Sequence, residues 1–427
     1  MYATEIQAGW RREAQLILLC AAAASSPERL DRLHILINTG VDWEVVMSVA
    51  LRQGVMPSVY RALTPALASH LPPSVWDRMR REFYGNAVRN FHLAAEMRRL
   101  CRLLEKHGVR SLALKGPTLA AGVYGNLTLR QFTDLDLLVR QDDLGAALAA
   151  LEGDGFRTKA PLKKTPGEVP SGWEATFVRE RGLFELDLHW RLSPPYFPFT
   201  PEGDELWARA IEVDLGPGGV FTLGPDDLML FLCAHGAKHG WQSLSGVCDV
   251  AQAARVHKYD WEALAGRAKM LGSLRILLLG LLLAHDLLGA AIPNVLIEAA
   301  RGERSVERGA RIFCRYFHQL GAKGPGLFQR WSIPLAMIPQ RAARFRYALA
   351  RAFLPAPKDF DFVNLPYALS PLYYAVRPLR LALQKRPTGP LCHRPLYPAR
   401  GQASGSSTTM TAPQPLSGTG PAWKIRL

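Results

Sequence analysis

The chain has 427 residues, of which 48% are hydrophobic and 21% are charged, and its formal net charge is +15. This length and composition allow a large buried core and predict two or three domains. The longest uninterrupted apolar runs cover residues 16–24 and 276–284, nine residues each, far short of the roughly 20 residues that a membrane span needs. We therefore expect a globular protein without a transmembrane segment.

The cysteines and the first residues bear on where the protein works. Six cysteines are spread along the chain without a paired motif, which favours reduced thiols and a cytoplasmic protein. Residues 16–24 resemble the apolar core of a signal peptide, but Glu5 and Glu13 do not suit the positively charged segment that precedes such a core. Export is the weaker alternative.

The N-terminal part of the chain is predicted to be mainly helical. Its amphipathic stretches cover residues 12–24, 43–63 and 88–106, where apolar residues recur at helical spacing. These helices lead into a strand that begins at about residue 111.

A strand, a tight turn and a helix are predicted over residues 112–124. The apolar residues 112–114 are followed by Lys115, Gly116 and Pro117, and then by a segment of helical character. Glycine at such a turn lets the backbone approach a ligand closely, and the amides at a helix start favour anions. The turn is a candidate site for a triphosphate, although most turns of this kind only connect two elements.

The most informative segment reads TDLDLLV at residues 133–139. It has the pattern of a buried strand, yet it carries Asp134 and Asp136, whose side chains point to the same face roughly 7 Å apart at the backbone. Two carboxylates at that distance repel each other unless a cation lies between them. Oxygen ligands of this kind suit Mg²⁺ that holds phosphates. The alternative is a strand end with two solvated acids.

A β-hairpin is predicted over residues 176–190, with its turn at residues 180–182. In the second strand Glu185, Asp187 and His189 share one face, and the intervening apolar residues share the other. This hairpin supplies a further carboxylate, for which Asp187 and Glu185 compete. His189 is expected to be a hydrogen-bond partner and not a metal ligand, because Mg²⁺ prefers oxygen.

A helix that begins near Pro225 carries His235 and His239 on one face, and Asp249 follows. Two histidines and an aspartate at this spacing could hold zinc or form a metal-dependent phosphohydrolase centre. Because the helix is apolar, the favoured interpretation is a pair of half-buried histidines, one of them oriented by Asp249.

The positive charge is concentrated in the last third of the chain. Residues 301–400 hold 18 Lys and Arg against 4 Asp and Glu, whereas residues 1–300 have a net charge of −1. Arginines alternate with aromatic residues in segments 341–351 and 373–380, which could suit RNA, an anionic membrane or an acidic partner. The alternative is a solvated helix face. The nearly neutral remainder disfavours a long nucleic acid as substrate.

The glycine turn and the paired acids together resemble the DNA polymerase beta-type nucleotidyltransferase superfamily. Several short motifs, in this order along the chain, are similar to those of the largely uncharacterised bacterial nucleotidyltransferase family, and the resemblance covers about residues 10–385. These motifs are VDW at 41–43, QGVMP at 53–57, LALKGPTLAAGVYGN at 112–126, LRQFTDLDLLV at 129–139, LDLHWRL at 186–192 and LCAHGAKHGW at 232–241.

The resemblance implies an α+β fold, in which a polymerase beta-like core of a small mixed sheet with helices is flanked by N- and C-terminal helical regions. We expect an N-terminal helical region at 1–107, the α/β core at 108–215, a helical domain at 216–320, a basic proline-interrupted extension at 321–385 and a disordered tail at 386–427.

The resemblance also implies the transfer of a nucleoside monophosphate from a nucleoside triphosphate to a hydroxyl of an acceptor, with pyrophosphate released. Asp134, Asp136 and Asp187 would be the catalytic residues and the ligands of two Mg²⁺ ions. The expected nucleotide-binding residues are Lys115, Gly116, Arg130, Thr133, Lys238 and His239. A small molecule, a sugar or a protein could be the acceptor.

Two alternatives remain from the sequence. One is a non-catalytic nucleotide-binding or scaffold protein of the same fold, although three converging acids are more than binding requires. The other is a phosphohydrolase built on His235, His239 and Asp249, which would bind a transition metal.

Overall fold

The computed structural model describes residues 10–22, 27–63, 67–159, 172–179, 184–199, 201, 203–319, 327–363 and 365–383. The turn expected at residues 180–182 and the tail expected from residue 386 lie outside these ranges. Helices surround one seven-stranded sheet of mixed direction, in the order β3-β4-β5-β2-β1-β7-β6. The α+β fold class expected from the sequence is confirmed.

The strands pair so that segments far apart in the sequence become neighbours. They are β1 (Ser111–Ala113), β2 (Asp134–Val139), β3 (Phe156–Thr158), β4 (Glu174–Arg179), β5 (Glu185–His189), β6 (Ile211–Val213) and β7 (Val220–Thr222). Strands β4 and β5 are antiparallel, as the expected hairpin requires. Strand β2 pairs with β1 in the antiparallel sense and with β5 in the parallel sense. The acid-bearing strands β2 and β5 are therefore adjacent at the centre of the sheet.

The N-terminal region is helical, as expected, but its second amphipathic stretch is two helices. The elements are α2 (Arg12–Ala21), α3 (Pro27–Asn38), α4 (Trp43–Arg52), α5 (Met56–Leu63), η1 (Ala68–His70) and α6 (Pro73–Lys106). Asp42 caps α4 by accepting a hydrogen bond of 3.1 Å from the amide of Val45. The chain breaks between α4 and α5 at Gly54, whose φ of +68° is the left-handed conformation that glycine adopts without strain.

The remaining helices follow and interrupt the strands. They are α7 (Pro117–Gly122), η2 (Leu127–Leu129), α8 (Leu144–Gly153), α9 (Asp204–Ala208), α10 (Pro225–Lys238), α11 (Leu244–Val256), α12 (Trp261–Met270), α13 (Leu274–Leu288), α14 (Asn294–Gly302), α15 (Arg304–His318), α16 (Leu327–Met337), α17 (Arg341–Phe353), α18 (Pro357–Phe362), η3 (Tyr367–Leu372) and α19 (Tyr373–Leu383). Among the residues described, no helix is both long and apolar enough to cross a bilayer.

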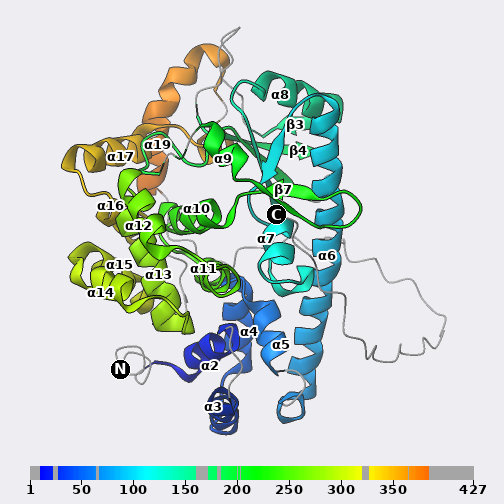
Figure 1. The fold of residues 1–427 in the computed structure, drawn as a ribbon, viewed down its shortest axis with the longest axis vertical. Coiled ribbons are helices and arrows are strands. Elements are labelled where there is room, and N and C mark those ends of the chain that lie inside the picture. Colours follow the sequence, from blue (N-terminus) through cyan, green and yellow to red (C-terminus); the bar gives the residue numbers. More distant parts are fainter. Residues whose placement is uncertain are drawn as a thin grey trace, which may run out of the picture.

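The two faces of the sheet belong to two hydrophobic cores. In β2, Leu135 and Leu137 join the core formed with α6 and α8. Leu138 belongs to the second core, which unites α2, α4 and α5 with α10, α11, α13 and α15. Figure 1 shows α6 along one side of the molecule and the helices from α10 onward on the other. Because side chains alternate along a strand, Asp134 and Asp136 lie on the face toward α10.

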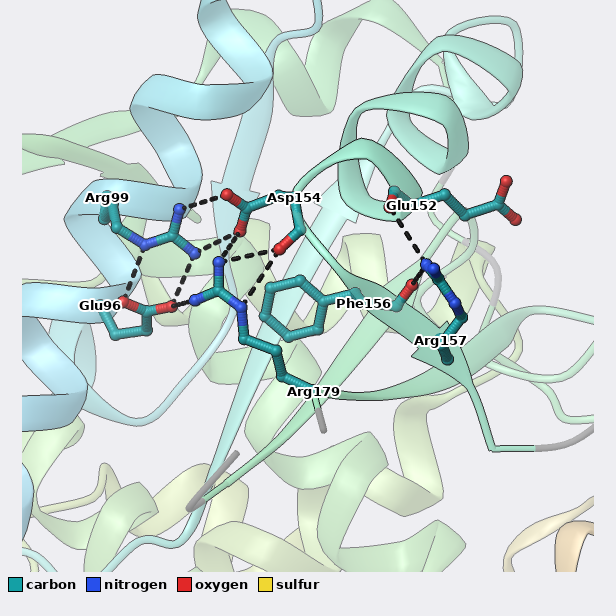
Figure 2. A network of polar contacts seen from close by, with 7 residues as sticks. All are labelled: Glu96, Arg99, Glu152, Asp154, Phe156, Arg157 and Arg179. Atoms are coloured by element: carbon teal, nitrogen blue, oxygen red, sulfur yellow. Dashed lines mark hydrogen bonds and ion pairs between the residues drawn. The ribbon is translucent and has the colours of Figure 1, made fainter. Parts of the chain in front are cut away.

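A cluster of charged residues ties α6 to the edge of the sheet (Figure 2). The Nη2 atoms of Arg99 and Arg179 lie 2.6 and 2.8 Å from Oδ2 of Asp154. Arg99 also donates to Glu96 one turn earlier on α6, with Nε 2.9 Å from Oε2. The guanidinium of Arg179 packs over the ring of Phe156 at 5.3 Å. Two arginines from different elements thus share one carboxylate and fix the sheet against the long helix.

The sheet continues past residue 215, where the sequence suggested that the α/β core ends. Strand β7 pairs with β1, with Ala113 and Thr222 as partners, and the hydroxyl of Thr222 donates to the carbonyl of Ala113 at 2.5 Å. The region of the chain that forms the sheet therefore ends near residue 222.

The basic C-terminal extension is folded against itself by a buried ion-pair cluster. The side chain of Asp359 has no exposed surface, and its oxygens lie 3.2 Å from Nη1 of Arg377 and 2.5 Å from Nε of Arg380. The side chains of these two arginines are 11% and 7% exposed. Arg377 and Arg380 are therefore internal structural residues, which explains part of the positive charge without any external partner.

We predict that Asp359→Asn loosens residues 341–383. The change leaves two buried guanidinium groups without their carboxylate, which typically costs about 3–5 kcal/mol. Hydrogen–deuterium exchange should show loss of protection in α17 and α19, while β2 and β5 stay protected. Lys358→Ala, at the exposed neighbouring position, is the matched control. Unchanged protection in Asp359→Asn would contradict the structural role of this cluster.

Candidate functional site

The pairing of β2 with β5 brings the candidate catalytic acids together. In this parallel pair Asp136 is the partner of Asp187, and Asp134 is the partner of Glu185. Partner residues of adjacent strands are about 4.8 Å apart and point to the same face. The carboxylates of Asp134, Asp136 and Asp187 therefore share the face of the sheet toward α10.

The apolar residues of the two strands explain why the acids point this way. Leu135 and Leu137 of β2, and Leu186 and Leu188 of β5, are fully buried in the core formed with α6 and α8. A shift of one residue in either strand would expose these leucines and bury the acids in that core. The hydrophobic pattern thus fixes the orientation of the acids.

Asp136 is held by two basic side chains. Its Oδ2 lies 3.2 Å from Nζ of Lys115, and its Oδ1 lies 3.2 Å from Nε2 of His189. Burial opposes ionisation of Asp136, but Lys115 and His189 outweigh it and lower the pKa of the carboxyl. Burial likewise opposes the charged form of Lys115, yet Asp136 and Asp134 leave its pKa raised. His189 lies where the sequence placed it, as a hydrogen-bond partner of an acid.

Of the two aspartates on β2, Asp134 has the negative charge that nearby cations balance less well. Burial, and then the charge of Asp136, raise its pKa, and Lys115 and Arg130 only partly oppose this effect. A further cation close to this carboxylate would relieve both causes of the shift.

Asp187 has the pKa of a group that can exchange a proton near neutral pH. Burial raises its pKa to about 6, although the hydroxyl of Thr176 donates a hydrogen bond of 2.6 Å to its Oδ1. Thr176 is its partner on β4. Glu185, the competing residue, is exposed and forms an ion pair of 2.6 Å with Lys159. Asp187 is therefore the residue that the sheet places beside Asp136.

Helix α10 brings a row of basic side chains over the acids. Nε2 of His235 lies 3.4 Å from Nζ of Lys115, and the rings of His235 and His239 are 4.5 Å apart. Burial lowers the pKa of both histidines, with further lowering by Lys115 and Lys238. Burial also lowers the pKa of Lys238, although Glu174 lies 4.0 Å away and opposes the shift. Lys238 therefore lies on the side of the acids toward β4, and His239 follows it in the chain.

A cleft of about 230 Å³ lies beside Asp134 and Asp136, and Lys238 is not part of its lining. Gly116 lines it with a φ of +62°, which favours glycine at the turn before α7. Among the expected site residues, Asp187, Lys238 and His239 are not part of its lining. The lining residues are Leu51, Arg52, Gly54, Lys115, Gly116, Arg130, Gln131, Phe132, Thr133, Asp134, Asp136, Ser243 and Ser245.

One wall of this cleft comes from the N-terminal helices, which the sequence had not assigned to the site. The side-chain oxygen of Gln53 accepts a hydrogen bond of 2.7 Å from the backbone amide of Leu244. The backbone carbonyl of Gln53 accepts one of 3.0 Å from the backbone amide of Ser245. These bonds join the turn after α4 to the loop before α11. The motif QGVMP at 53–57, which contains Gln53, was part of the family resemblance, but no pattern in the sequence indicated its contact with residues 244 and 245.

Asp249 does not orient a histidine of α10, so that expectation is wrong. Its two oxygens lie 2.9 Å from Nε and Nη2 of Arg130, and the hydroxyl of Tyr124 donates to Oδ1 at 2.7 Å. The carbonyl of Arg130 accepts hydrogen bonds from the side chains of Asn86 and Asn90 on α6. Arg130 lines the cleft, but two of its nitrogens are already occupied by this network.

The structure does not assemble the transition-metal centre that the sequence left open. His235 and His239 lie together, whereas Asp249 is engaged with Arg130 and Tyr124. In the described part of the chain, no three His, Cys, Asp or Glu side chains converge closely enough to hold a metal ion.

The comparison with protein families agrees with this geometry. The family model described as "Uncharacterised nucleotidyltransferase" matches residues 39–289, a range that contains β1 to β7 and α10. A search of the curated proteins finds no significant match. The matched range holds every residue of the candidate site and ends before the basic C-terminal extension.

We predict that Asp249→Asn destabilises the protein by about 3–5 kcal/mol, because the charge of Arg130 then remains buried without its carboxylate. Tyr124→Phe should cost only about 1 kcal/mol, since it removes one hydrogen bond. Urea denaturation followed by circular dichroism would measure both losses. Equal, small losses would show that Asp249 does not form a structural pair with Arg130.

Proposed function

The chain belongs to the uncharacterised nucleotidyltransferase family, and from this premise we propose that it moves a nucleoside monophosphate from a nucleoside triphosphate to a hydroxyl group of an acceptor. Membership makes it a transferase of nucleotidyl groups. The observation that carries the proposal is the pairing of Asp136 with Asp187 next to Asp134, at the edge of a cleft lined by a glycine turn.

The cleft beside Asp134 is the proposed site of the triphosphate. Lys115 supplies a buried positive charge there, and the turn at Gly116 lets the backbone approach phosphate oxygens. Thr133 adds a hydroxyl to the lining. Arg130 contributes less than the sequence suggested, because Asp249 already binds its Nε and Nη2.

The acids fit a divalent cation by the chemistry of their oxygen donors. Asp134, Asp136 and Asp187 would hold Mg²⁺ only together with substrate phosphates, which Mg²⁺ prefers alongside carboxylate oxygens, because the three carboxylates do not converge closely enough to bind an ion by themselves. When bound, one or two Mg²⁺ ions would neutralise charge that develops on the phosphates. The raised pKa of Asp134 supports this assignment, since burial and Asp136 leave its negative charge poorly balanced.

The acceptor is proposed to approach from the side of β5 and β4. There Asp187, oriented by Thr176, would take the proton of the acceptor hydroxyl while that oxygen bonds to the α-phosphorus. The bond from the α-phosphorus to the bridging oxygen breaks, and pyrophosphate leaves. Lys238 lies on this side, and Lys238 and the following His239 would contact the acceptor or the transferred group.

A small hydroxylated molecule, a sugar or a protein side chain fits this site better than a nucleic acid. A nucleic-acid channel is normally lined by many cations, whereas residues 1–300, which contain the site, have a net charge of −1. The scaffold alternative predicts tight nucleotide binding without turnover. It leaves unexplained why Asp187 is partly buried at the pairing position of Asp136.

Asp136→Asn should abolish nucleotide transfer while the protein still folds, with a loss of stability because buried Lys115 then lacks its carboxylate. The amide keeps the shape of the side chain but removes the charge, and a loss of several kcal/mol of transition-state stabilisation corresponds to at least about a thousand-fold. The measurement incubates the protein with each labelled triphosphate, Mg²⁺ and cell lysate, and identifies the labelled product. Circular dichroism would confirm that the variant is folded.

The matched comparison is Asp187→Asn against Glu185→Gln. Both residues point to the same face of β5, but Glu185 is exposed and paired with Lys159. We expect activity to fall at least about a hundred-fold in Asp187→Asn and to stay unchanged in Glu185→Gln. Wild-type activity in Asp136→Asn, or the reverse order of these two variants, would refute the assignment of the acids.

Removal of divalent cations should stop the reaction, because the carboxylates and the phosphates would then repel each other. Dialysis against a chelator, followed by stepwise addition of Mg²⁺, would measure this dependence. Full activity without Mg²⁺, or restoration by Zn²⁺ alone, would exclude the proposed role of the three acids.

A further inference from the structure

The extension from α17 to α19 exposes an unusual amount of apolar surface. Of twenty large hydrophobic side chains that are exposed in the described residues, eleven lie within residues 345–383. They are Phe345, Leu349, Phe353, Leu354, Phe362, Val363, Leu369, Leu372, Tyr374, Leu379 and Leu383. Exposed apolar patches of this kind commonly mark an interaction surface.

Three of these residues form a continuous stripe on α17. Phe345, Leu349 and Phe353 follow each other at intervals of four residues, so they share one face of the helix over about 12 Å. The opposite face packs inward through Tyr347, which is 1% exposed and lies 5.9 Å from the ring of Tyr196. The stripe is therefore the outer face of a packed helix.

The stripe belongs to a folded unit and is not the result of local unfolding. Helix α19 packs against α17, and α18 and η3 pack against α19. The buried cluster of Asp359, Arg377 and Arg380 fixes this arrangement. Because those two arginines are paired with Asp359 inside the protein, any positive charge that contacts a partner must come from other residues.

Cations are exposed beside the stripe. Arg341 and Arg346 are exposed on α17 and Lys358 is exposed on α18, and among the acids of this unit whose side chains the structure describes, Asp359 is buried. The sequence that follows, residues 384–427, holds six Lys and Arg and no Asp or Glu. An apolar stripe flanked by cations is the pattern of a helix that lies in the interface of an anionic bilayer.

We propose that the outer face of α17 and the adjoining surface of α19 dock on an anionic lipid membrane. The apolar side chains would enter the boundary between headgroups and acyl chains, and the cations would contact the headgroups. A second copy of this chain is a poorer occupant, because two such faces would bring like charges together. A nucleic acid would match the cations but would leave the apolar side chains without a partner. None of the proposed catalytic residues is involved.

The test is sedimentation of the full-length protein with lipid vesicles. Vesicles of phosphatidylcholine alone are compared with vesicles that contain one third phosphatidylglycerol, at low and high salt. We expect binding to the anionic vesicles that weakens with salt. The triple variant Phe345→Ser, Leu349→Ser, Phe353→Ser should bind at least ten-fold more weakly, and Arg341→Glu with Arg346→Glu should do the same without a change in apolar area.

The matched control is a stripe of the same kind on α6. Tyr84, Val88 and Phe91 are 57%, 62% and 57% exposed, compared with 65%, 43% and 46% for the stripe on α17. Their replacement by serine should leave vesicle binding unchanged. All variants are checked for folding by circular dichroism, and the double arginine variant keeps the proposal testable if the triple variant fails to fold.

Several outcomes would overturn the proposal. These are no binding to anionic vesicles, an equal loss in the α6 control, or a wild-type dimer that the α17 variant converts to a monomer. Binding of labelled RNA that the α17 variant abolishes, with no vesicle binding, would also overturn it. Nucleotidyl transfer in solution is measured on the same variants, so failure of docking is separate from failure of the proposed catalysis.

Discussion

The parallel pairing of β2 with β5 is the constraint on which the candidate site depends. It places Asp136 beside Asp187, and no segment of the chain could do this alone, because the two residues are about fifty positions apart. The buried leucines of both strands fix the register, since a shift of one residue would turn the acids into the core. The apolar residues that alternate with the acids in β2 and β5 thus fix the position of the acids.

The electrostatic balance of the site follows from this pairing. Several acids on one face would destabilise the sheet unless cations opposed them, and the fold supplies those cations from two directions. Lys115 arrives from the turn after β1, and α10 brings Lys238 to Glu174. Buried charges of both signs then depend on one another, so that binding of a polyanion or a divalent cation would shift the whole set.

The two ends of the chain contribute differently to this centre. The N-terminal helices form one wall of the cleft through Leu51, Arg52 and Gly54, and they share a hydrophobic core with α10 and α13. The C-terminal unit packs on the other side, where Tyr347 of α17 meets Tyr196. Its outer face is apolar and basic, which separates a surface suited to docking from the interior that holds the substrate site.

The sequence by itself determined the local features. Alternation in TDLDLLV and in residues 185–190 predicted two strands with acids on one face, and Gly116 predicted a turn. Only the tertiary structure decided which groups meet. Asp249 pairs with Arg130 and Tyr124, Gln53 joins the turn after α4 to the loop before α11, and Asp359 pairs with buried Arg377 and Arg380. The alternation of apolar and polar residues predicts the face of a strand on which a side chain lies. An ion pair between distant segments depends on how those segments pack, and the residues near either partner in the sequence do not determine this.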